Sequence, residues 1–71
     1  MKYTVIYEKG VATWGAYVPD LPGVIAVGDS QEEVECFIRE AVEFHIEGLR
    51  AEGLAVPSPA SWAGTLEIVA A

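Results

Sequence analysis

A chain of 71 residues makes one domain and buries only about 60% of the surface that its unfolded form exposes. Its single cysteine excludes an internal disulfide and favours a reducing, cytoplasmic setting, and its single histidine leaves no paired Cys/His metal site. A net charge of −7 argues against direct binding to nucleic-acid phosphates, and no apolar run is long enough to cross a membrane. Because 52% of the residues are apolar, more than so small an interior can bury, we expect a homo-oligomer.

Three strands are expected first. Residues 2–8 alternate in polarity, and a Lys-Gly turn leads to a second strand over about 12–18, which Pro19 ends because proline lacks a backbone donor. The turn sequence Asp-Leu-Pro-Gly then precedes a β-branched apolar run at 24–27. This run predicts a third strand, central in the sheet.

An amphipathic helix is expected next. Ser30 and Glu33 match a capping box, and Asp29 with Glu32 offers a second register of the same device. Gly53 is placed to end the helix in the left-handed conformation. The predicted apolar stripe consists of Val34, Ile38, Ala41, His45 and Leu49.

A proline-containing loop after the helix leads to a last expected strand at 64–69, with Leu66 and Ile68 on its inward side. The order β-β-β-α-β predicts an α+β fold over residues 1–71, with one helix covering one face of a three- to four-stranded sheet. We expect the other face to form the oligomer interface through Tyr3, Tyr7, Trp14 and Tyr17.

No residue pattern supports catalysis, a metal or a cofactor. Asp20 and Asp29 flank the third strand at too great a separation to share a metal or a proton. His45 is interpreted as a neutral core imidazole, and the acids around Cys36 should raise the pKa of its thiol and leave it inert. The residues interpreted as structural are Asp20, Pro22, Gly23, Gly28, Asp29, Ser30 and Glu33.

Excess acid has two explanations, solubility or a basic partner. The polar side of the predicted helix carries acids suited to a basic partner. Our candidates for the partner-binding face are Glu40, Glu43 and Glu47.

Three segments together resemble the HicB-like antitoxin family: "VPDLPG" followed after four residues by "GDSQEEV", the helix "EAVEFHIEGLRAEG", and the "VPSP" loop. The resemblance runs from Tyr3 to about Val69. It implies a partial ribonuclease-H-like domain that oligomerises through its sheet and binds a small basic toxin, which cleaves RNA and whose catalytic histidine becomes masked.

Members of this family usually carry a C-terminal DNA-binding module, which is absent from this sequence, so we expect a stand-alone N-terminal-type domain without autoregulation of its own. Metal-dependent nucleases of related shape need converging carboxylates, and Glu8 is the one acid on the first strand, so nuclease activity is not transferred. The first alternative to an antitoxin is an oligomeric structural or ligand-binding domain without a toxin. The second, less favoured alternative is a small metal-dependent nuclease.

Overall fold

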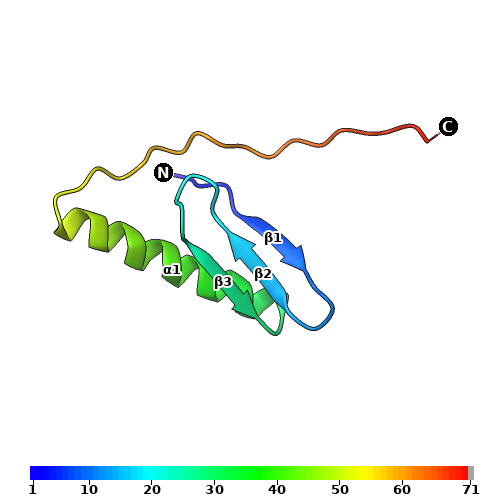
Figure 1. Ribbon diagram of the computed structural model, residues 1–71, viewed down its shortest axis with the longest axis horizontal. Helices are drawn as coiled ribbons and strands as arrows, with labels where there is room; N and C mark the ends of the chain where they lie inside the picture. The colour runs from blue at the N-terminus through cyan, green and yellow to red at the C-terminus, as the bar shows by residue number, and fades with distance from the viewer. Residues whose placement is uncertain (71) are drawn as a thin grey trace.

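The computed structural model describes residues 1–70. An antiparallel meander forms from β1 (Ile6–Lys9), β2 (Trp14–Tyr17) and β3 (Ile25–Gly28), in the sheet order β1-β2-β3. The helix α1 (Gln31–Ala51) then crosses one face of this sheet and contacts β2 and β3 (Figure 1). Three strands followed by one helix confirm the predicted α+β class.

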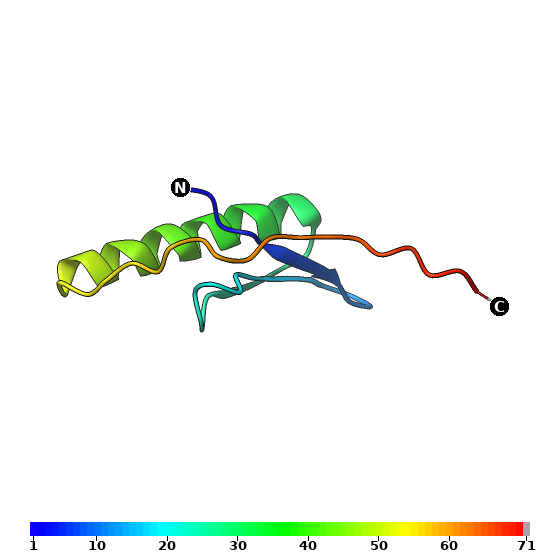
Figure 2. The same cartoon turned by 90° about the horizontal axis from the view of Figure 1, so that it is seen from above.

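The register of the strands assigns each side chain to one of two faces. Tyr7, Ala16 and Ala26 are paired across the three strands, and the buried Ala16 shows that this row faces the helix. Tyr17 and Ile25 belong to the neighbouring row, which points the other way because side chains alternate along a strand. Seen from above, the helix lies on one side of the sheet only (Figure 2).

Two successive turns carry the chain from β2 to β3. The amide of Leu21 donates to the carbonyl of Val18, and the amide of Val24 donates to the carbonyl of Leu21, both at 3.1 Å. Gly23 has φ +86°, and proline before such a glycine is the pattern of a type II turn. The turns fold Leu21 inward, where it is completely buried.

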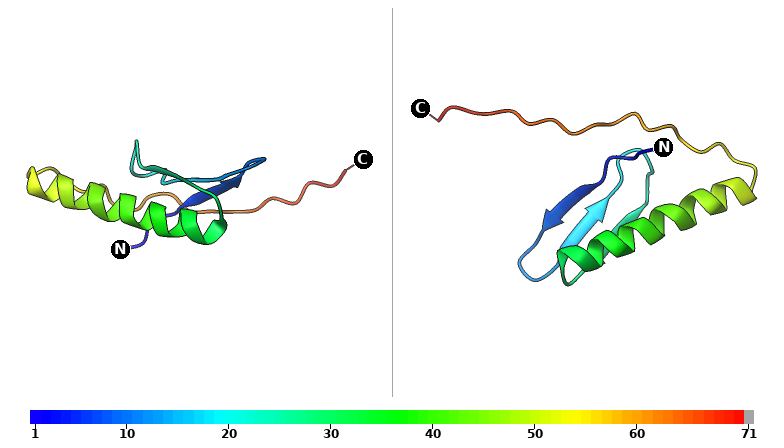
Figure 3. Two further views of the ribbon diagram at one scale, coloured as in Figure 1. Left: turned by 90° about the horizontal axis from the view of Figure 1, so that it is seen from below. Right: turned by 180° about the vertical axis from the view of Figure 1, so that it is seen from behind.

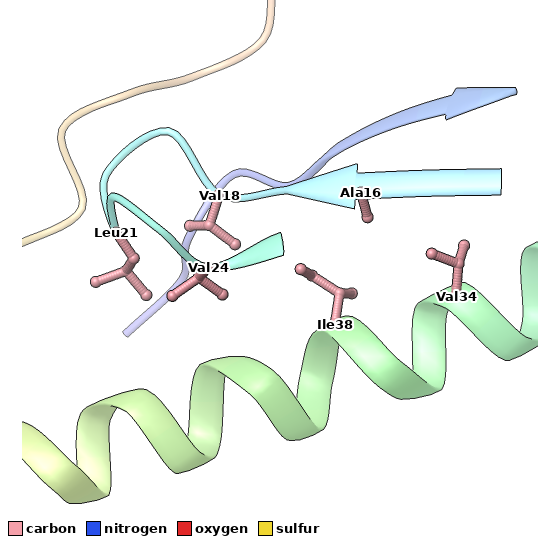
Figure 4. Close-up of a cluster of buried hydrophobic side chains, with 6 residues drawn as sticks. All are labelled: Ala16, Val18, Leu21, Val24, Val34 and Ile38. Carbon is pink, nitrogen blue, oxygen red and sulfur yellow. The ribbon is translucent and has the colours of Figure 1, made fainter. Parts of the chain in front are cut away.

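The hydrophobic core is small and draws on the sheet, the turn and the helix. Six apolar residues are buried in it: Ala16, Val18, Leu21, Val24, Val34 and Ile38 (Figure 4). Tyr3, Val5 and Trp14 are among the half-buried side chains that pack against this cluster. No polar or charged residue among residues 1–70 is buried.

The entrance to α1 confirms the predicted cap. The Ser30 hydroxyl accepts from the Glu33 amide at 3.1 Å, while the Glu33 carboxylate accepts from the amide of Asp29 at 2.9 Å. The returning bond therefore reaches the residue before the cap rather than the cap itself. Gly28 leaves the room that this entrance requires, because a Cβ atom there would lie 2.9 Å from the backbone nitrogen of Val34.

The far end of α1 also follows expectation. Gly53 adopts φ +69°, and its amide donates to the carbonyl of Arg50 at 3.1 Å. The amide of Leu54 donates to the carbonyl of Leu49 at 2.9 Å. This pair of bonds is the Schellman arrangement, which satisfies carbonyls that the helix leaves free.

The segment after the helix differs from expectation. Residues 54–70 form no strand, so the strand predicted at 64–69 is not paired within this chain. The segment runs back past the N-terminus and then away from the body (Figures 1 and 3). An extended segment becomes a strand only when another strand accepts and donates its backbone hydrogen bonds, and here none does.

Candidate functional site

The uncovered sheet face holds fewer aromatic side chains than predicted. Tyr3 and Trp14 pack against the core, and Tyr7 shares the helix-facing row of Ala16. Of the four predicted residues, Tyr17 alone lies on the uncovered face. Trp14 and Tyr17 are three positions apart on one strand, and such an odd separation places side chains on opposite faces.

A compact apolar patch nevertheless occupies the uncovered face. It consists of Tyr17 from β2 and Ile25 and Val27 from β3, and the two aliphatic side chains are 69% and 60% exposed. Tyr17 is the one member of the predicted oligomer interface that lies in this patch, and the use of that interface stays a prediction.

The acidic residues proposed for partner binding lie together. Glu40, Glu43 and Glu47 are all exposed on α1, and their spacing of three and four places them on one face. Val34 and Ile38 are the buried residues of the same helix and mark the side that faces the sheet. The three carboxylates therefore point into solvent and are free to meet a partner.

Cys36 lies beside this acidic face. Its thiol is 3.7 Å from a carboxylate oxygen of Glu40, and the negative charge of Glu40 raises the pKa of the thiol above its ordinary value. A raised pKa keeps the sulfur protonated and poorly nucleophilic. The raised pKa agrees with expectation, and the inertness of the thiol stays a prediction.

The imidazole of His45 and the acidic side chains do not assemble into a reactive centre within residues 1–70. His45 is half-buried on the flank of α1 and is not part of the core cluster, so its predicted place in the core is wrong. Within residues 1–70, no three side chains of His, Cys, Asp or Glu converge to hold a metal ion. No helix in the same range is long and apolar enough to span a membrane.

Asp20 has a role that the sequence did not reveal. Its carboxylate accepts from the amides of Ala60 and Ser61 at 2.9 and 3.0 Å and from the Ser61 hydroxyl at 2.8 Å. These bonds, led by the one from Ala60, hold the pKa of Asp20 below its ordinary value of 3.8. Thr4 adds a bond from its hydroxyl to the Ser61 carbonyl at 2.7 Å, and the Tyr3 hydroxyl donates to the carbonyl of Pro57.

This hydrogen-bonded group, which we name the clamp, fixes residues 57–61 beside the start of β1. The predicted turn residue Asp20 is thus also an anchor between segments 40 positions apart. No short-range pattern connects the two segments. In the sequence, the clamp is indicated only by two separate motifs, Asp-Leu-Pro-Gly and Pro-Ser-Pro, which lie near its two ends.

A groove opens between β1 and α1. Its volume is about 380 Å³, and both apolar and charged side chains line it. The lining residues without charge are Met1, Tyr3, Val5, Tyr7, Ile38 and Val42, and the charged residues are Glu35, Arg39 and Glu43. The groove therefore has a mixed apolar and charged lining along the outer edge of the sheet.

The model of the HicB-like antitoxins of bacterial toxin-antitoxin systems matches residues 3–68. The chain belongs to this family. The match includes the turn, the capped helix, the clamp and most of the segment that leaves the body. It confirms the family indicated by the sequence motifs.

Two similar proteins extend this assignment. A chain in a solved structure of the HicA3 and HicB3 toxin-antitoxin complex is 32% identical, with a TM-score of 0.69 over 83% of this HicB-like chain and 69% of that chain. An uncharacterized 14.9 kDa protein from the rep-hol intergenic region of Haemophilus phage HP1 (strain HP1c1) is 35% identical over 57 residues, which are 80% of this chain. The matched region spans 43% of the phage protein, so the chain corresponds to less than half of that relative.

Proposed function

We propose that this protein is an antitoxin that neutralises a small basic RNA-cleaving toxin of a type II toxin-antitoxin system by forming a complex with it. The observation that carries the proposal is the family match over residues 3–68. The likeness to a chain of the HicA3–HicB3 complex supports it, because that structure contains both components of such a system. The protein acts by binding, without a reaction of its own, and in the cytoplasm, where an RNA-cleaving toxin has its substrate.

The charge of the molecule suits a basic partner. The chain has a net charge of −7, and Glu40, Glu43 and Glu47 concentrate part of it on one exposed helix face. Opposite fields on two proteins accelerate their encounter and orient it. We propose that this face makes the first contact with the toxin.

The function is tested by rescue of growth. A short basic reading frame, sought beside this gene, is expressed from an inducible promoter with and without this chain, and growth and RNA integrity are followed. We expect growth arrest and RNA cleavage with the toxin alone and recovery with both proteins. If arrest persists while both proteins are present in soluble form, the antitoxin function is refuted.

The docking face is tested by reversing two of its charges. The double variant Glu40→Lys with Glu47→Lys should bind the purified toxin more weakly and with a smaller dependence on salt. The matched control reverses Glu8 and Glu52, which are also exposed and lie elsewhere, and produces the same change in net charge. Equal weakening in both variants would mean that overall charge, and not this face, directs the encounter.

A further inference from the structure

The side of α1 that faces away from the sheet carries a row of side chains in which phenylalanine and glutamate alternate. We name this row the seam, and it consists of Phe37, Glu40, Phe44 and Glu47. Steps of three and four residues keep all of these side chains on one side of a helix. Phe37 is 42% exposed and Phe44 is 80% exposed. Seen from behind, no other part of residues 1–70 crosses this side of the helix (Figure 3).

The two phenylalanines form the apolar part of the seam. Their separation in the chain is nearly two helical turns, so they lie in line along the helix axis about 10.5 Å apart. Neither of them belongs to the buried core cluster. Phenylalanine is a weaker helix former than leucine, lysine or glutamate, so helix stability does not explain its place on an exposed side. Aromatic side chains in such a position are typical of the anchors by which a protein holds a partner.

Gly48 lies beside the seam, one helical turn after Phe44. Glycine inside a helix lowers the stability of that helix relative to alanine, and neither conformation nor packing within residues 1–70 requires a glycine at this position. Gly48 lacks the positive φ of Gly23 and Gly53, and a Cβ atom at position 48 would meet no atom within 4 Å. The residue therefore leaves open space on the outside of α1, where the backbone of another molecule can approach closely.

The two glutamates determine which kind of partner suits the seam. Glu40 precedes Phe44 by four residues and Glu47 follows it by three, so both carboxylates flank this ring on the helix surface. A second copy of the chain would bring a further net charge of −7, and nucleic acid would bring phosphates, so like charges repel in both cases. Lysine and arginine are attracted to the carboxylates, and their charged groups also bind the faces of aromatic rings. The seam therefore suits a partner surface that is both basic and apolar.

The spacing of the seam suits a helix of that partner. The backbone groups inside α1 bond within the helix, so a partner is held here by side chains. A helix presents its own side chains at steps of three and four residues, and its ridges pack into the grooves of a facing helix. An amphipathic helix with lysine or arginine beside its apolar row matches the seam in spacing and in charge, and Gly48 lets its backbone come close.

We propose that a helix of the basic toxin docks on the seam. Its apolar side chains contact Phe37 and Phe44, and its lysine or arginine residues lie beside Glu40 and Glu47. The inference rests on the proposed function and adds the kind of segment that binds and the residues that hold it. The carboxylates act at a distance and set the rate of association, whereas the phenylalanines act in contact and set the rate of dissociation.

The first measurement is the pair of rate constants for binding of each variant to the toxin protein used in the growth-rescue experiment. Phe44→Ala should raise the dissociation rate constant by about 30-fold or more and leave the association rate constant within about threefold. Glu40→Lys with Glu47→Lys should mainly lower the association rate constant. Circular dichroism checks that each variant stays folded. A dissociation rate constant that Phe44→Ala leaves unchanged would overturn the proposal.

The matched control removes an exposed apolar side chain from a different surface. Ile25 is 69% exposed on the uncovered face of the sheet, and Ile25→Ala should change neither rate constant by more than about threefold. A loss of affinity in Ile25→Ala without a loss in Phe44→Ala would place the toxin on the sheet and reject docking on the seam.

The second measurement separates docking from folding at Gly48. Gly48→Leu puts a good helix former into open space, so the Tm of the free chain should rise by about 4 °C. The same side chain should obstruct the approach of the partner helix and raise the Kd for the toxin by about 100-fold or more. A higher Tm with an unchanged Kd would refute close docking on this side of α1.

Growth rescue distinguishes a failure of this inference from a failure of the proposed function. If the unaltered chain neither binds the toxin nor restores growth, the antitoxin function is refuted and docking on the seam with it. If the unaltered chain restores growth and the double variant Phe44→Ala with Gly48→Leu binds and protects equally well, the function stands and the seam is rejected. If Phe44→Ala changes the mass of the free chain in solution but not its affinity for the toxin, the seam joins copies of the chain and the proposal is also rejected.

Discussion

Replacing Leu21 by alanine tests whether the Asp-Leu-Pro-Gly turn belongs to the core. The side chain is 0% exposed and lies beside Val18 and Val24 in the core cluster (Figure 4). Three carbon atoms are removed, which costs about 2.4 kcal/mol of transfer free energy at about 0.8 kcal/mol each. The two turn hydrogen bonds of the Leu21 backbone resist collapse around the vacated space, and the remaining cavity raises the expected loss to about 3 kcal/mol.

This loss is a large part of the stability of the molecule. A domain of 71 residues has a free energy of unfolding of about 4–11 kcal/mol. Urea unfolding followed by circular dichroism, at one fixed chain concentration, should show a much lower midpoint and a fall in Tm of more than about 10 °C. The control Leu54→Ala removes the same atoms from a side chain that is 54% exposed and should change stability by less than about 0.5 kcal/mol. A loss below about 1 kcal/mol for Leu21→Ala, at an unchanged m-value, would refute the assignment of this turn to the core.

Three further predictions concern the helix cap, the clamp and the thiol. Ser30→Ala should reduce the free energy of unfolding by about 1 kcal/mol, while Ser30→Asp, which keeps a capping oxygen, should restore most of it in the same urea assay. The pKa of Asp20 is lowered on folding, so the clamp stabilises the protein above the ordinary pKa of this carboxyl, and the stabilisation is lost as pH falls through the folded pKa. The NMR chemical shift of the Ser61 amide should therefore titrate with a midpoint below 3.8. The Asp20→Asn variant should not show this titration. Glu40→Gln removes the main charge that raises the pKa of the Cys36 thiol, so alkylation by iodoacetamide at pH 8 should become faster, and an unchanged rate would contradict the assigned cause.

Much of the local structure could be predicted from the sequence because short-range chemistry determines it. Ser30 and Glu33 have the sequence spacing of a capping box. Gly53 adopts without strain the left-handed conformation that ends the helix. Alternating polarity located β1 and β2 and the apolar run at 24–27 located β3, each to within four residues. The predicted central place of β3 is wrong, because β2 is the central strand and β3 lies at an edge. The acidic helix face followed from the helical repeat alone.

Tertiary structure decided the features that depend on distant partners. Alternation separates two faces of a strand but does not say which of them a helix covers, so Tyr3, Tyr7 and Trp14 were assigned to the wrong side. The clamp joins Asp20 to residues 60 and 61, and the burial of Leu21 arises only when the turn closes over α1. The segment at 64–69 shows the division most clearly: its sequence determines an amphipathic strand, but a strand forms only where an open edge supplies hydrogen bonds, and the fold directs this segment away from its own edge.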